Sequence, residues 1–538
     1  MLHSLKSKFV QELSRRELFR RGSLLALPAL LPESLASAAA TGTPKLRVGT
    51  DIYRSIGVRP LINARGTFTI VSGSTMLPEV RAAMDAAAQH YVQLDELMDA
   101  IGARLAELTK TEWGMVSSGC AAGLTHATAA CVAGGNPDLH VRIPNLAGFP
   151  KDEVIIPKHS RNVYDASVRA VGVKIIEVGT GEELEAAFGP KTAMVYVLAG
   201  PQADEGPVST SAIAQLAKQK GVPVLVDAAA ELLTVPNVHL EKGATLVTYS
   251  GGKCIRGPQT GGLLLGRKDL VQAAWVHSAP HHGFARGFKV GKEEAMGMLM
   301  AVEMWMQRDH KAEWNRWLAW LDHISKRVST IEGVKTAVRE PEGLSNHTPT
   351  LSISWDRTRL GISGREVARQ LMDGEPRITV SGSRDQREGT ESGISIIPYM
   401  MAAGEEKIVA DRVYALPSKP SKEPAENQAP PSADLSGQWD VQIEYAAGKS
   451  KHTLHLRQQG NRIEGSHQGD FVSRDLSGSI DGDTVQISSR YTERHGDSLM
   501  FTFNGKASGN EMSGSLDMGE YLKARWTGKR HDYRSNRG

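Results

Sequence analysis

The pattern of apolar and polar residues gives the first part of the chain a regular alternation. From residue 43 to about 335, short apolar runs such as VKIIEV and VPVLVD alternate with stretches in which apolar residues recur every three or four positions. The short runs have the length of buried strands, and the longer stretches have the period of amphipathic helices. This alternation predicts an α/β domain built on a mostly parallel sheet with helices on both faces.

Two further units follow. A long helical stretch over 295–330 leads into TLSISWD, RITVSG and GISIIPYM, which predict a small α+β domain. Residues 416–434 are rich in proline and predict an extended linker. Beyond it, short alternating runs separated by Gly, Asp and Asn predict an antiparallel β meander or small barrel over 435–531. We place the large domain at 43–295 and the long helix with the small domain at 296–415.

In the sequence of the β region, His, Cys and acidic residues do not form a cluster that would indicate a catalytic site. We therefore interpret it as a binding or stabilising module and not as a second active site.

Residues 1–42 have the composition of an export signal. The segment SRRELFRRG is followed by a weakly hydrophobic stretch with prolines at 28 and 32 and small residues near Ala36. The pair Arg15-Arg16 resembles the twin-arginine type, which carries folded proteins and predicts a periplasmic location. The alternative is a membrane anchor or a basic amphipathic helix. The apolar run is shorter than the ~20 residues that a membrane span needs, so we predict no transmembrane anchor.

Composition narrows the possible partners. Of the 538 residues, 40% are hydrophobic and 23% are charged, which is typical of a soluble globular protein. The formal net charge is only +3 and the charges are interspersed, so we expect no nucleic-acid partner. The three cysteines, Cys120, Cys131 and Cys254, do not make a disulfide framework or a pair with metal-ligand spacing. We expect no metal site.

One candidate site lies where a predicted strand runs into small residues. Ser118, Gly119, Cys120 and Ala121 join this strand to the helical stretch LTHATAACVA. Small side chains at a helix N-terminus expose backbone N–H groups, which together with the helix dipole bind anions. Small residues at such a turn equally serve close packing of helix and strand.

Asp227 and Lys253 also follow predicted buried strands. A carboxylate directly after VPVLV is costly to desolvate and needs a cationic or hydrogen-bonding partner, although Asp is also a common helix cap. Lys253 lies among glycines in SGGKCIRGPQTGG, straight after ATLVTYS. The alternative for Lys253 is an ordinary surface lysine. The glycines favour a site, because they let backbone and ligand approach closely.

Together these three features match the requirements of pyridoxal 5′-phosphate. This cofactor needs an anion site for its phosphate, a carboxylate facing its protonated pyridine nitrogen, and a lysine that forms a Schiff base. Lys253 would hold the cofactor, be displaced by substrate, and then act as acid or base at the substrate α-carbon. The order and spacing of the three features favour this interpretation more than any one motif does.

The same segments resemble a known family. SGGKCIRGPQTGGLLLGRKDL is similar to the lysine loop of bacterial selenocysteine synthase and, more closely, of D-glucosaminate-6-phosphate ammonia-lyases. The resemblance covers 52–415 and includes GVRPLINARGTFTIVSGSTMLPEV, SSGCAAGL, VLVDAAAELL and GFARGFKVGKEEAMGMLMA. It implies the aminotransferase-like fold type I of pyridoxal-phosphate enzymes, with Lys253 as the covalent lysine, Asp227 as the partner of the pyridine nitrogen, and a homodimer or larger assembly. It also implies that Ser118, Gly119, Cys120 and Ala121 surround the phosphate. We add Ser250 as a further candidate for cofactor binding.

Further contacts are predicted from residue type and position. His159, Asn162 and Tyr164 follow a strand, and we favour Tyr164 as the group that stacks on or orients the cofactor ring. Cations near a cofactor suit a substrate carboxylate or phosphate. The alternative is that the charges of the 281–292 loop pair with Glu293 and Glu294. The candidate substrate-binding residues are Asn63, Arg65, Thr67, Arg286, Lys289 and Arg377.

These observations predict an enzyme that acts on a small amino acid or amino sugar acid. The chain has no basic RNA-binding extension, which argues against a tRNA substrate. We expect Lys253 to abstract the Cα proton and β-elimination to release ammonia and an unsaturated or keto acid. The alternatives are a racemase or epimerase, an aldolase that performs retro-aldol cleavage, and a non-catalytic envelope protein that acts through its β region.

Overall fold

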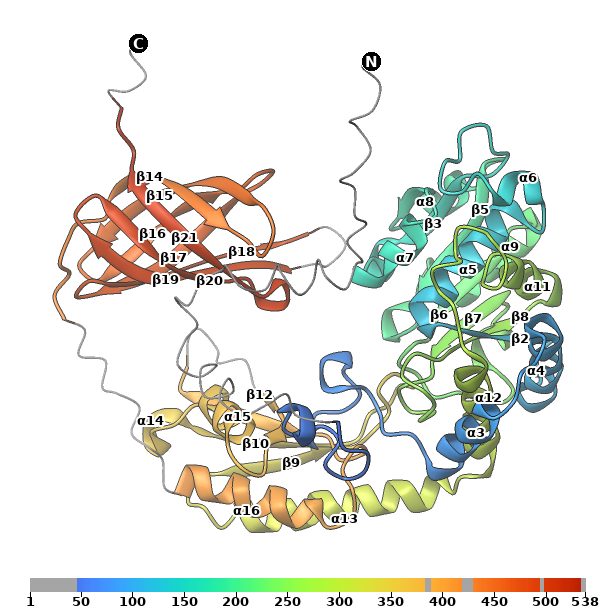
Figure 1. Cartoon of the computed structure of the whole chain (residues 1–538), viewed down its shortest axis with the longest axis horizontal. Helices are drawn as coiled ribbons and strands as arrows, with labels where there is room; N and C mark the ends of the chain where they lie inside the picture. The colour runs from blue at the N-terminus through green and yellow to red at the C-terminus, as the bar shows by residue number, and fades with distance from the viewer. Residues whose placement is uncertain (1–45, 383–388, 419–428, 494–497, 534–538) are drawn as a thin grey trace, which may run out of the picture. The chain divides into compact units, whose positions relative to one another are not determined.

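The computed structural model describes residues 46–382, 389–418, 429–493 and 498–533 of the chain (Figure 1). The predicted export signal at 1–42 lies outside these residues, as does the middle of the predicted linker. Residues 46–61 form a short unit by themselves with one 3-10 turn, η1 (Arg54–Ile56). The rest of the described chain has three hydrophobic cores, which belong to a sheet domain, an α+β domain and a barrel.

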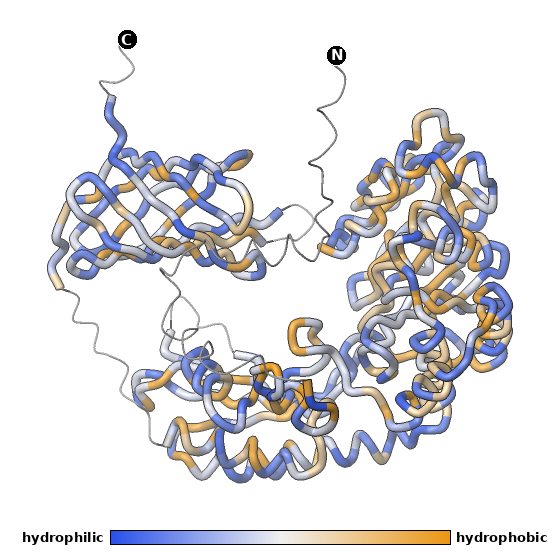
Figure 2. Tube along the Cα trace, viewed as in Figure 1, coloured by the Kyte–Doolittle hydropathy of each residue, from blue (hydrophilic) through white to orange (hydrophobic). Residues whose placement is uncertain are grey.

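A seven-stranded sheet forms the centre of the first core. Its strand order is β2 (Trp113–Ser117), β8 (Gly262–Gly266), β7 (Leu246–Ser250), β6 (Val224–Asp227), β5 (Thr192–Leu198), β3 (Glu153–Pro157) and β4 (Lys174–Val178). Strand β8 runs antiparallel to β2 and β7, and the other pairs are parallel. The mostly parallel sheet predicted from the sequence is therefore confirmed. Hydrophobic residues concentrate on these strands and on the helices beside them (Figure 2).

Helices pack on the sheet because their apolar residues recur with helical spacing. Helix α5 (Gly119–Ala133) is buried along nearly its whole length and contacts β5, β6, β7 and β8. Gly123 permits this approach, because a Cβ there would lie 2.5 Å from Thr248 Oγ1. The other helices of this domain are α3 (Pro78–Ala88), α4 (Leu94–Thr109), α6 (Pro137–His140), α7 (Ala166–Arg169), α8 (Gly181–Ala187), α9 (Thr210–Lys220), α10 (Val238–Glu241), α11 (Lys268–Val276) and α12 (Lys292–Gln307).

The long helix predicted over 295–330 is two helices. Helix α12 ends at Gln307, and α13 (His310–Val328) begins after the N-cap Asp309, whose side chain accepts a hydrogen bond from Ala312 N. The apolar period continues across this break, so the sequence pattern alone did not reveal the cap.

Helix α13 leads into the α+β domain. An antiparallel sheet in the order β12 (Ser381–Gly382), β13 (Glu391–Ile396), β10 (Thr350–Asp356), β9 (Lys335–Arg339) is accompanied by α14 (Arg357–Leu360), α15 (Gly364–Asp373) and α16 (Glu405–Ser418). Strand β1 (Ile62–Asn63) pairs parallel with β11 (Ile378–Thr379). Ile62 and Ala64 pack in this second core, whereas the sequence analysis grouped them with the large domain.

The C-terminal region is a closed antiparallel barrel of eight strands. Each strand pairs with the next, and β14 pairs with β21 to close the barrel. Along β14 the alternate residues Trp439, Val441 and Ile443 are buried, as the period of two predicts. The strands are β14 (Gly437–Glu444), β15 (Lys449–Gln459), β16 (Arg462–Gln468), β17 (Ser473–Asp481), β18 (Thr484–Thr492), β19 (Ser498–Ser508), β20 (Glu511–Asp517) and β21 (Lys523–Arg530).

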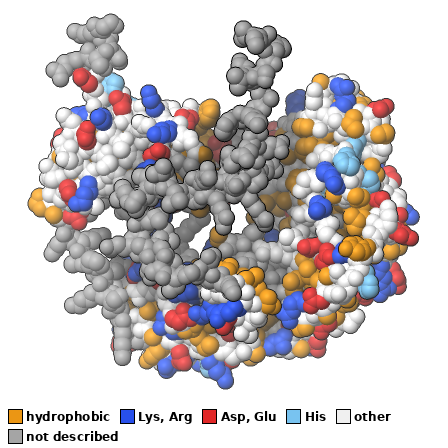
Figure 3. All heavy atoms as spheres, in the orientation of Figure 1, with side chains coloured by type: hydrophobic (Ala, Val, Ile, Leu, Met, Phe, Trp, Pro, Cys, Tyr) orange, Lys and Arg blue, Asp and Glu red, His pale blue; other side chains and the backbone are white. Residues whose placement is uncertain are grey.

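The described surface carries charges of both signs. On the face shown in Figure 3, basic and acidic side chains are interspersed without a field of one sign. Among the described residues, no helix is both long and apolar enough to cross a lipid bilayer.

Candidate cofactor site at the carboxyl ends of the parallel strands

The three predicted features lie at one edge of the sheet. Gly119–Ala121 open α5 directly after β2, Asp227 is the last residue of β6, and Lys253 lies just after β7. These three strands run in the same direction, so their carboxyl ends meet at the same edge, where ligands bind in open α/β sheets.

Asp227 is buried and held by three donors. The residue as a whole is only 2% exposed. Oδ2 accepts from Tyr196 OH at 3.0 Å, and Oδ1 accepts from Ala229 N at 3.1 Å and from Cys120 Sγ at 3.4 Å. Burial raises the pKa of Asp227, while the three hydrogen bonds and the charge of Lys253 act in the opposite direction. A protonated ring nitrogen at this carboxylate would supply the cation that it lacks.

Tyr196 is a site residue that the sequence analysis missed. It lies in the middle of β5, and its hydroxyl accepts a hydrogen bond from Asn162 Nδ2 at 2.9 Å while donating to Asp227. Asn162 Nδ2 also donates to Ser160 O at 2.8 Å, which fixes the amide. The available signal was a tyrosine inside the buried strand TAMVYVL, because a buried tyrosine hydroxyl needs a hydrogen-bond partner.

The N-terminus of α5 is open toward solvent on one side. Gly119 has φ +81°, and a Cβ there would meet nothing within 4 Å. Ala121 is exposed, although most of the helix is buried. The Ser118 side chain makes no capping hydrogen bond, so the amides of the first turn are available to an anion. Gly123 serves packing, as one interpretation of these small residues expected, whereas Gly119 leaves open space, and the anion site stays a prediction.

The glycines of the lysine loop have a different role from the one expected. A Cβ on Gly251, Gly257 or Gly261 would lie 2.4, 2.9 or 3.1 Å from Met298 Sδ on α12. Gly251 N also donates to Gly261 O at 2.8 Å, which closes the loop. These glycines therefore let the loop pack on its own chain, and the expectation that they give clearance to a ligand is corrected at these positions. Lys253 itself is half-buried.

Cys254, next to the lysine, is not a reactive group. Its thiol donates to Glu231 O at 3.1 Å, and burial raises its pKa to about 11. Ser250 ends β7 and pairs with Gly262 in the strand ladder.

Two aromatic side chains, His159 and Tyr164, are candidates for contact with the cofactor ring. His159 lies in η3 (Lys158–Ser160), directly after β3, and its buried Nε2 has no hydrogen-bond partner. Burial lowers the pKa of this imidazole. Tyr164 lies in η4 (Val163–Asp165) and is 60% exposed. Burial and the unpartnered nitrogen favour His159, and the assignment of Tyr164 stays a prediction.

The N-terminal candidates form one local arrangement. Asn63 Oδ1 accepts from Arg65 N and Gly66 N, both at 3.0 Å, so its side chain holds the turn. Thr67 Oγ1 lies 2.6 Å from Tyr399 OH. The Arg65 guanidinium lies 4.6 Å from the centroid of the Phe68 ring and makes no ion pair with any described residue. Arg65 is thus the member of this group whose side-chain N–H donors are not used in an ion pair with a described residue.

The other candidate substrate-binding cations make no described contact that ties them to the cofactor site. Arg286 and Lys289 are exposed, and Arg286 Nη1 donates to Pro280 O at 2.9 Å. Arg377 Nε donates to Met372 O at 2.9 Å within the α+β domain. Lys292 pairs with Glu293, as the alternative interpretation of this loop expected. No hydrogen bond or ion pair within the described ranges joins Arg286, Lys289 or Arg377 to Asp227 or Lys253.

These residues fit pyridoxal 5′-phosphate. Four features lie at strand ends of one sheet edge: an open helix N-terminus, a half-buried lysine and, as far as the described residues show, a buried carboxylate with no ion-pair partner and an imidazole nitrogen with no hydrogen-bond partner. In the described residues, no group of three or more His, Cys, Asp or Glu could hold a metal ion. Fold and site together define a pyridoxal-phosphate-dependent enzyme of fold type I.

Comparisons with known proteins agree with this class, although no protein-family model matches the chain. A D-glucosaminate-6-phosphate ammonia lyase from Salmonella typhimurium is 28% identical over 372 residues, which are 68% of this chain and 97% of the relative. A 5'-C-glycyluridine monooxygenase-decarboxylase from a Streptomyces species is 31% identical over 338 residues, 61% of this chain and 83% of the relative. An L-seryl-tRNA(Sec) selenium transferase from Moorella thermoacetica is 28% identical over 260 residues, 41% of this chain and 51% of the relative.

A solved structure shows the same fold. The structure of a D-glucosaminate-6-phosphate ammonia-lyase matches with a TM-score of 0.60 and 27% identity, and covers 68% of this chain and 98% of that one. The chain belongs to the fold type I pyridoxal-phosphate enzymes of the family that includes D-glucosaminate-6-phosphate ammonia lyase and selenocysteine synthase. The part of the chain beyond this match has no counterpart in the matched ammonia-lyase structure, which is covered almost completely.

Proposed function

We propose that the protein is a pyridoxal-phosphate-dependent lyase that removes the Cα proton of a small amino acid or amino sugar acid and eliminates a β-substituent. The observation that carries this proposal is the buried, triply hydrogen-bonded Asp227, combined with Lys253 at the neighbouring strand end. The similarity to an ammonia lyase along 97% of that relative supports elimination as the reaction type.

Each part of the site has a distinct task in holding the cofactor. Asp227 would accept a hydrogen bond from the ring nitrogen, and the first-turn amides of α5 would bind the phosphate. Lys253 would provide the covalent attachment, and His159 would contact the ring. When bound, the cofactor supplies an electron sink that stabilises negative charge at the substrate α-carbon.

Lys253 is the proposed proton carrier. Once freed from the cofactor, its Nζ amine would take the proton from Cα of the substrate, and the bound cofactor would supply the sink for the electron pair left on carbon. Departure of the β-substituent then forms the Cα–Cβ double bond. Lys253 would pass the Cα proton to the departing β-substituent and then return to its attachment, which releases the enamine. Hydrolysis of the enamine by one water gives a keto acid and ammonia.

Arg65 is the proposed anchor of the substrate carboxylate. Its guanidinium makes no ion pair among the described residues, and the turn that carries it is fixed by Asn63. Arginine suits this role because it binds a carboxylate through two parallel hydrogen bonds. Arg286, Lys289 and Arg377 remain candidates, and the family resemblance supports a homodimer as the working assembly.

One relative supports a different reaction. The 31% identical protein is named a monooxygenase-decarboxylase, so loss of CO₂ with consumption of oxygen is the second candidate. Reprotonation at Cα, which would make a racemase or epimerase, and retro-aldol cleavage use the same Lys253 and are the further alternatives. A non-catalytic envelope role through the barrel is the alternative from another functional class.

A substrate panel in deuterated water distinguishes these reactions. We expect ammonia and a keto acid from at least one amino acid or amino sugar acid, and loss of both products in Lys253→Ala. Lys220→Ala is a matched control, because it removes an exposed lysine of the same domain, at the end of α9, that belongs to no candidate site. Deuterium at Cα without ammonia would indicate a racemase, and oxygen uptake with CO₂ would indicate a decarboxylase. No reaction with any substrate by the cofactor-loaded protein would contradict the proposal.

For export, we propose the twin-arginine pathway and a periplasmic location. The supporting observation is the segment SRRELFRRG before a weakly hydrophobic stretch. The double change Arg15→Lys, Arg16→Lys should retain the protein in the cytoplasm. Unchanged export of this variant would refute the pathway.

A further inference from the structure

The lysine loop is hydrogen-bonded to the junction between α12 and α13. Arg308 is the residue directly after α12, and its Nη1 donates to Cys254 O at 3.0 Å. Cys254 follows Lys253 in the chain, so this hydrogen bond lies one residue from the proposed covalent lysine. The Arg308 side chain is only 10% exposed, which makes the contact part of the protein interior.

The break between the two helices sets where the Arg308 side chain begins. The backbone of Arg308 is extended, with φ −66° and ψ 137°, between the end of α12 at Gln307 and the N-cap Asp309 of α13. Asp309 Oδ1 accepts from Ala312 N at 2.9 Å, which fixes the start of α13. In a continuous helix the Cβ at this position would follow the helical direction instead. The break therefore contributes to the contact with the lysine loop.

The guanidinium of Arg308 is fixed from both helices. Nε and Nη2 donate to the two carboxylate oxygens of Glu313 on α13, at 3.2 and 2.7 Å. The guanidinium carbon lies 5.1 Å from the centroid of the Trp305 ring on α12, and Trp305 Nε1 donates to Leu233 O at 2.8 Å. One edge of the planar fork thus binds Glu313, and the remaining nitrogen binds Cys254 O. The single ammonium group of a lysine cannot reproduce this arrangement.

The ion pair between Arg308 and Glu313 is charged at neutral pH. Burial raises the pKa of Glu313, but its contacts with His310 and Arg308 outweigh burial and lower this pKa to about 2. A largely buried ion pair adds little net stability, because desolvation offsets most of the attraction between the charges. The pair is therefore better explained by the position in which it holds Nη1 of Arg308 than by a contribution to stability.

The segment that follows Asp227 is bound into the same arrangement. Cys254 Sγ donates to Glu231 O at 3.1 Å, which joins this segment to the lysine loop. Asn346 N, in the connection between β9 and β10, donates to Ala230 O at 2.8 Å. The segment after Asp227 is therefore linked both to the lysine loop and to the α+β domain.

We propose that Arg308 is a positioning residue for Lys253. By holding Cys254 O, its guanidinium fixes the backbone that carries the lysine, and Nζ of Lys253 thereby stays within reach of the cofactor. The inference rests on the proposed function, because it takes Lys253 as the covalent lysine. When the hydrogen bond is lost, the lysine meets the cofactor in the required geometry less often, and a displacement of about 1 Å can lower a rate ~100-fold.

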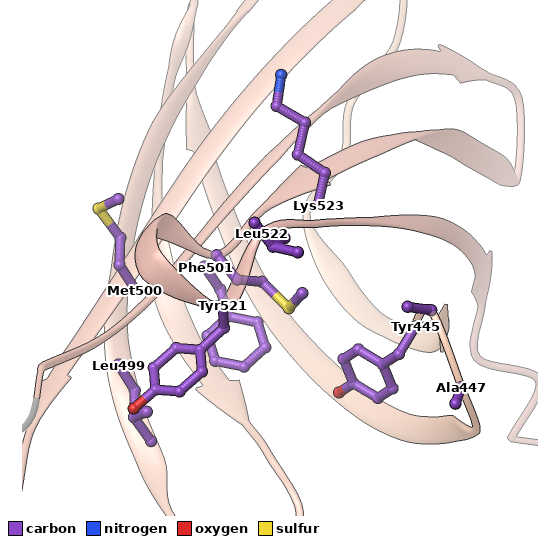
Figure 4. Close-up of a pocket in the computed structure, with 10 residues that line it drawn as sticks. Tyr445, Ala447, Leu499, Met500, Phe501, Tyr521, Leu522 and Lys523 are labelled. Carbon is purple, nitrogen blue, oxygen red and sulfur yellow. The ribbon is translucent and has the colours of Figure 1, made fainter. Parts of the chain in front are cut away.

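Borohydride trapping measures how fast Lys253 attaches the cofactor, without any turnover. Full-length protein freed of cofactor is mixed with pyridoxal 5′-phosphate, samples are reduced at intervals, and peptide mass spectrometry measures the label on each lysine. Excess cofactor also labels exposed lysines to a small extent, and Lys523 is the internal reference. Lys523 lines an apolar cavity of about 370 Å³ at one end of the barrel, and Figure 4 shows its side chain extending away from Phe501 and Tyr521.

Two variants of Arg308 separate positioning from folding. Arg308→Gln removes the donor to Cys254 O, and Arg308→Lys keeps a cation beside Glu313 without the rigid fork. Both should label Lys253 about 10-fold more slowly than the wild type, which is the value of one hydrogen bond, and should label Lys523 at an unchanged rate. The pH at which the visible absorption band of the loaded protein changes should also shift, because the surroundings of the attached Nζ are altered.

Arg104→Gln is the matched control. It removes a second two-pronged pair between an arginine and a glutamate of α12, in which Arg104 Nε and Nη2 donate to Glu303 at 2.7 and 3.0 Å. This variant should label Lys253 at the wild-type rate and keep the pH dependence of the absorption band.

The outcomes distinguish this inference from the proposed function. Wild-type labelling rates and an unchanged absorption profile in both Arg308 variants would overturn the positioning role and leave the proposed function standing. Absence of label on Lys253 in the wild type would overturn the proposed function, and this inference with it. An equal slowing at Lys523 would show a general loss of lysine reactivity and would also overturn the positioning role. Circular dichroism checks the fold, and if Arg308→Gln is unfolded, Arg308→Lys decides the test because it keeps the ion pair.

Discussion

The hydroxyl of Tyr196 is predicted to control how well the protein binds its cofactor. Tyr196→Phe removes the 3.0 Å hydrogen bond to Asp227 Oδ2 and leaves the ring in place. A hydrogen bond to a charged group contributes about 1.5–3 kcal/mol. Because about 1.4 kcal/mol is tenfold in affinity, pyridoxal 5′-phosphate should bind roughly 10- to 100-fold more weakly. The change also removes the acceptor of Asn162 Nδ2, but that amide keeps its hydrogen bond to Ser160 O.

The assay is a fluorescence titration of the cofactor at several pH values. Burial already raises the pKa of Asp227, and loss of a donor to the ionised form raises it further. The decline of affinity on the acid side should therefore begin at a higher pH in Tyr196→Phe than in wild type. Tyr249→Phe is the matched control, since Tyr249 is equally buried but its hydroxyl accepts from Asn237 at 2.7 Å. Equal affinities and equal pH profiles for both variants would refute this account of Asp227.

Three further predictions concern stability. Asp227→Asn should abolish cofactor binding yet stabilise the cofactor-free fold at pH 8 by roughly 1 kcal/mol. The pKa of Asp227 is raised in the folded protein, so ionisation of this carboxyl lowers the free energy of unfolding as the pH rises through that pKa. The stability gained by Asp227→Asn, measured by thermal denaturation, should therefore shrink at low pH. Gly251→Ala should destabilise by about 1–3 kcal/mol in urea denaturation, because its Cβ would lie 2.4 Å from Met298 Sδ, and wild-type stability would contradict the packing role. Arg474→Met should raise the melting temperature of the barrel, with a gain of about 1–3 kcal/mol, because Nε and Nη1 of this buried guanidinium have no hydrogen-bond partner among the described residues; a loss would show that its contact with the Phe501 ring and the charges of Asp470 and Glu493 outweigh that cost.

The sequence alone predicted the features that depend on the spacing of apolar residues along one segment and on which residues follow a strand. The seven-stranded sheet and the barrel follow from apolar runs and from alternation, which are set by which face of each strand is buried. The closeness of Asp227, Cys120 and Lys253 could also be predicted, because each follows a strand of the same direction and such strands end at one edge of the sheet. The break at Asp309 was not predicted, since the apolar period runs through it and only the cap marks it.

Features that depend on contacts between distant segments could not be predicted. The sequence run SGGKCIRGPQTGG does not show that its glycines face Met298, which lies in another helix. Tyr196 is hidden in a uniformly apolar strand, and its role appears only when β5 and β6 place it beside Asp227. In the barrel, His452, His467 and Arg474 are scattered singly along the chain and converge only when the strands close.

The most direct test of the account is the identity of the lysine that carries the cofactor. Protein loaded with pyridoxal 5′-phosphate is reduced with borohydride, which makes the attachment permanent, and its peptides are analysed by mass spectrometry. The account predicts the label on Lys253 in the peptide that begins after Lys242, and no stoichiometric label in Lys253→Ala. Stoichiometric labelling of another lysine, or none in the wild type, would contradict it.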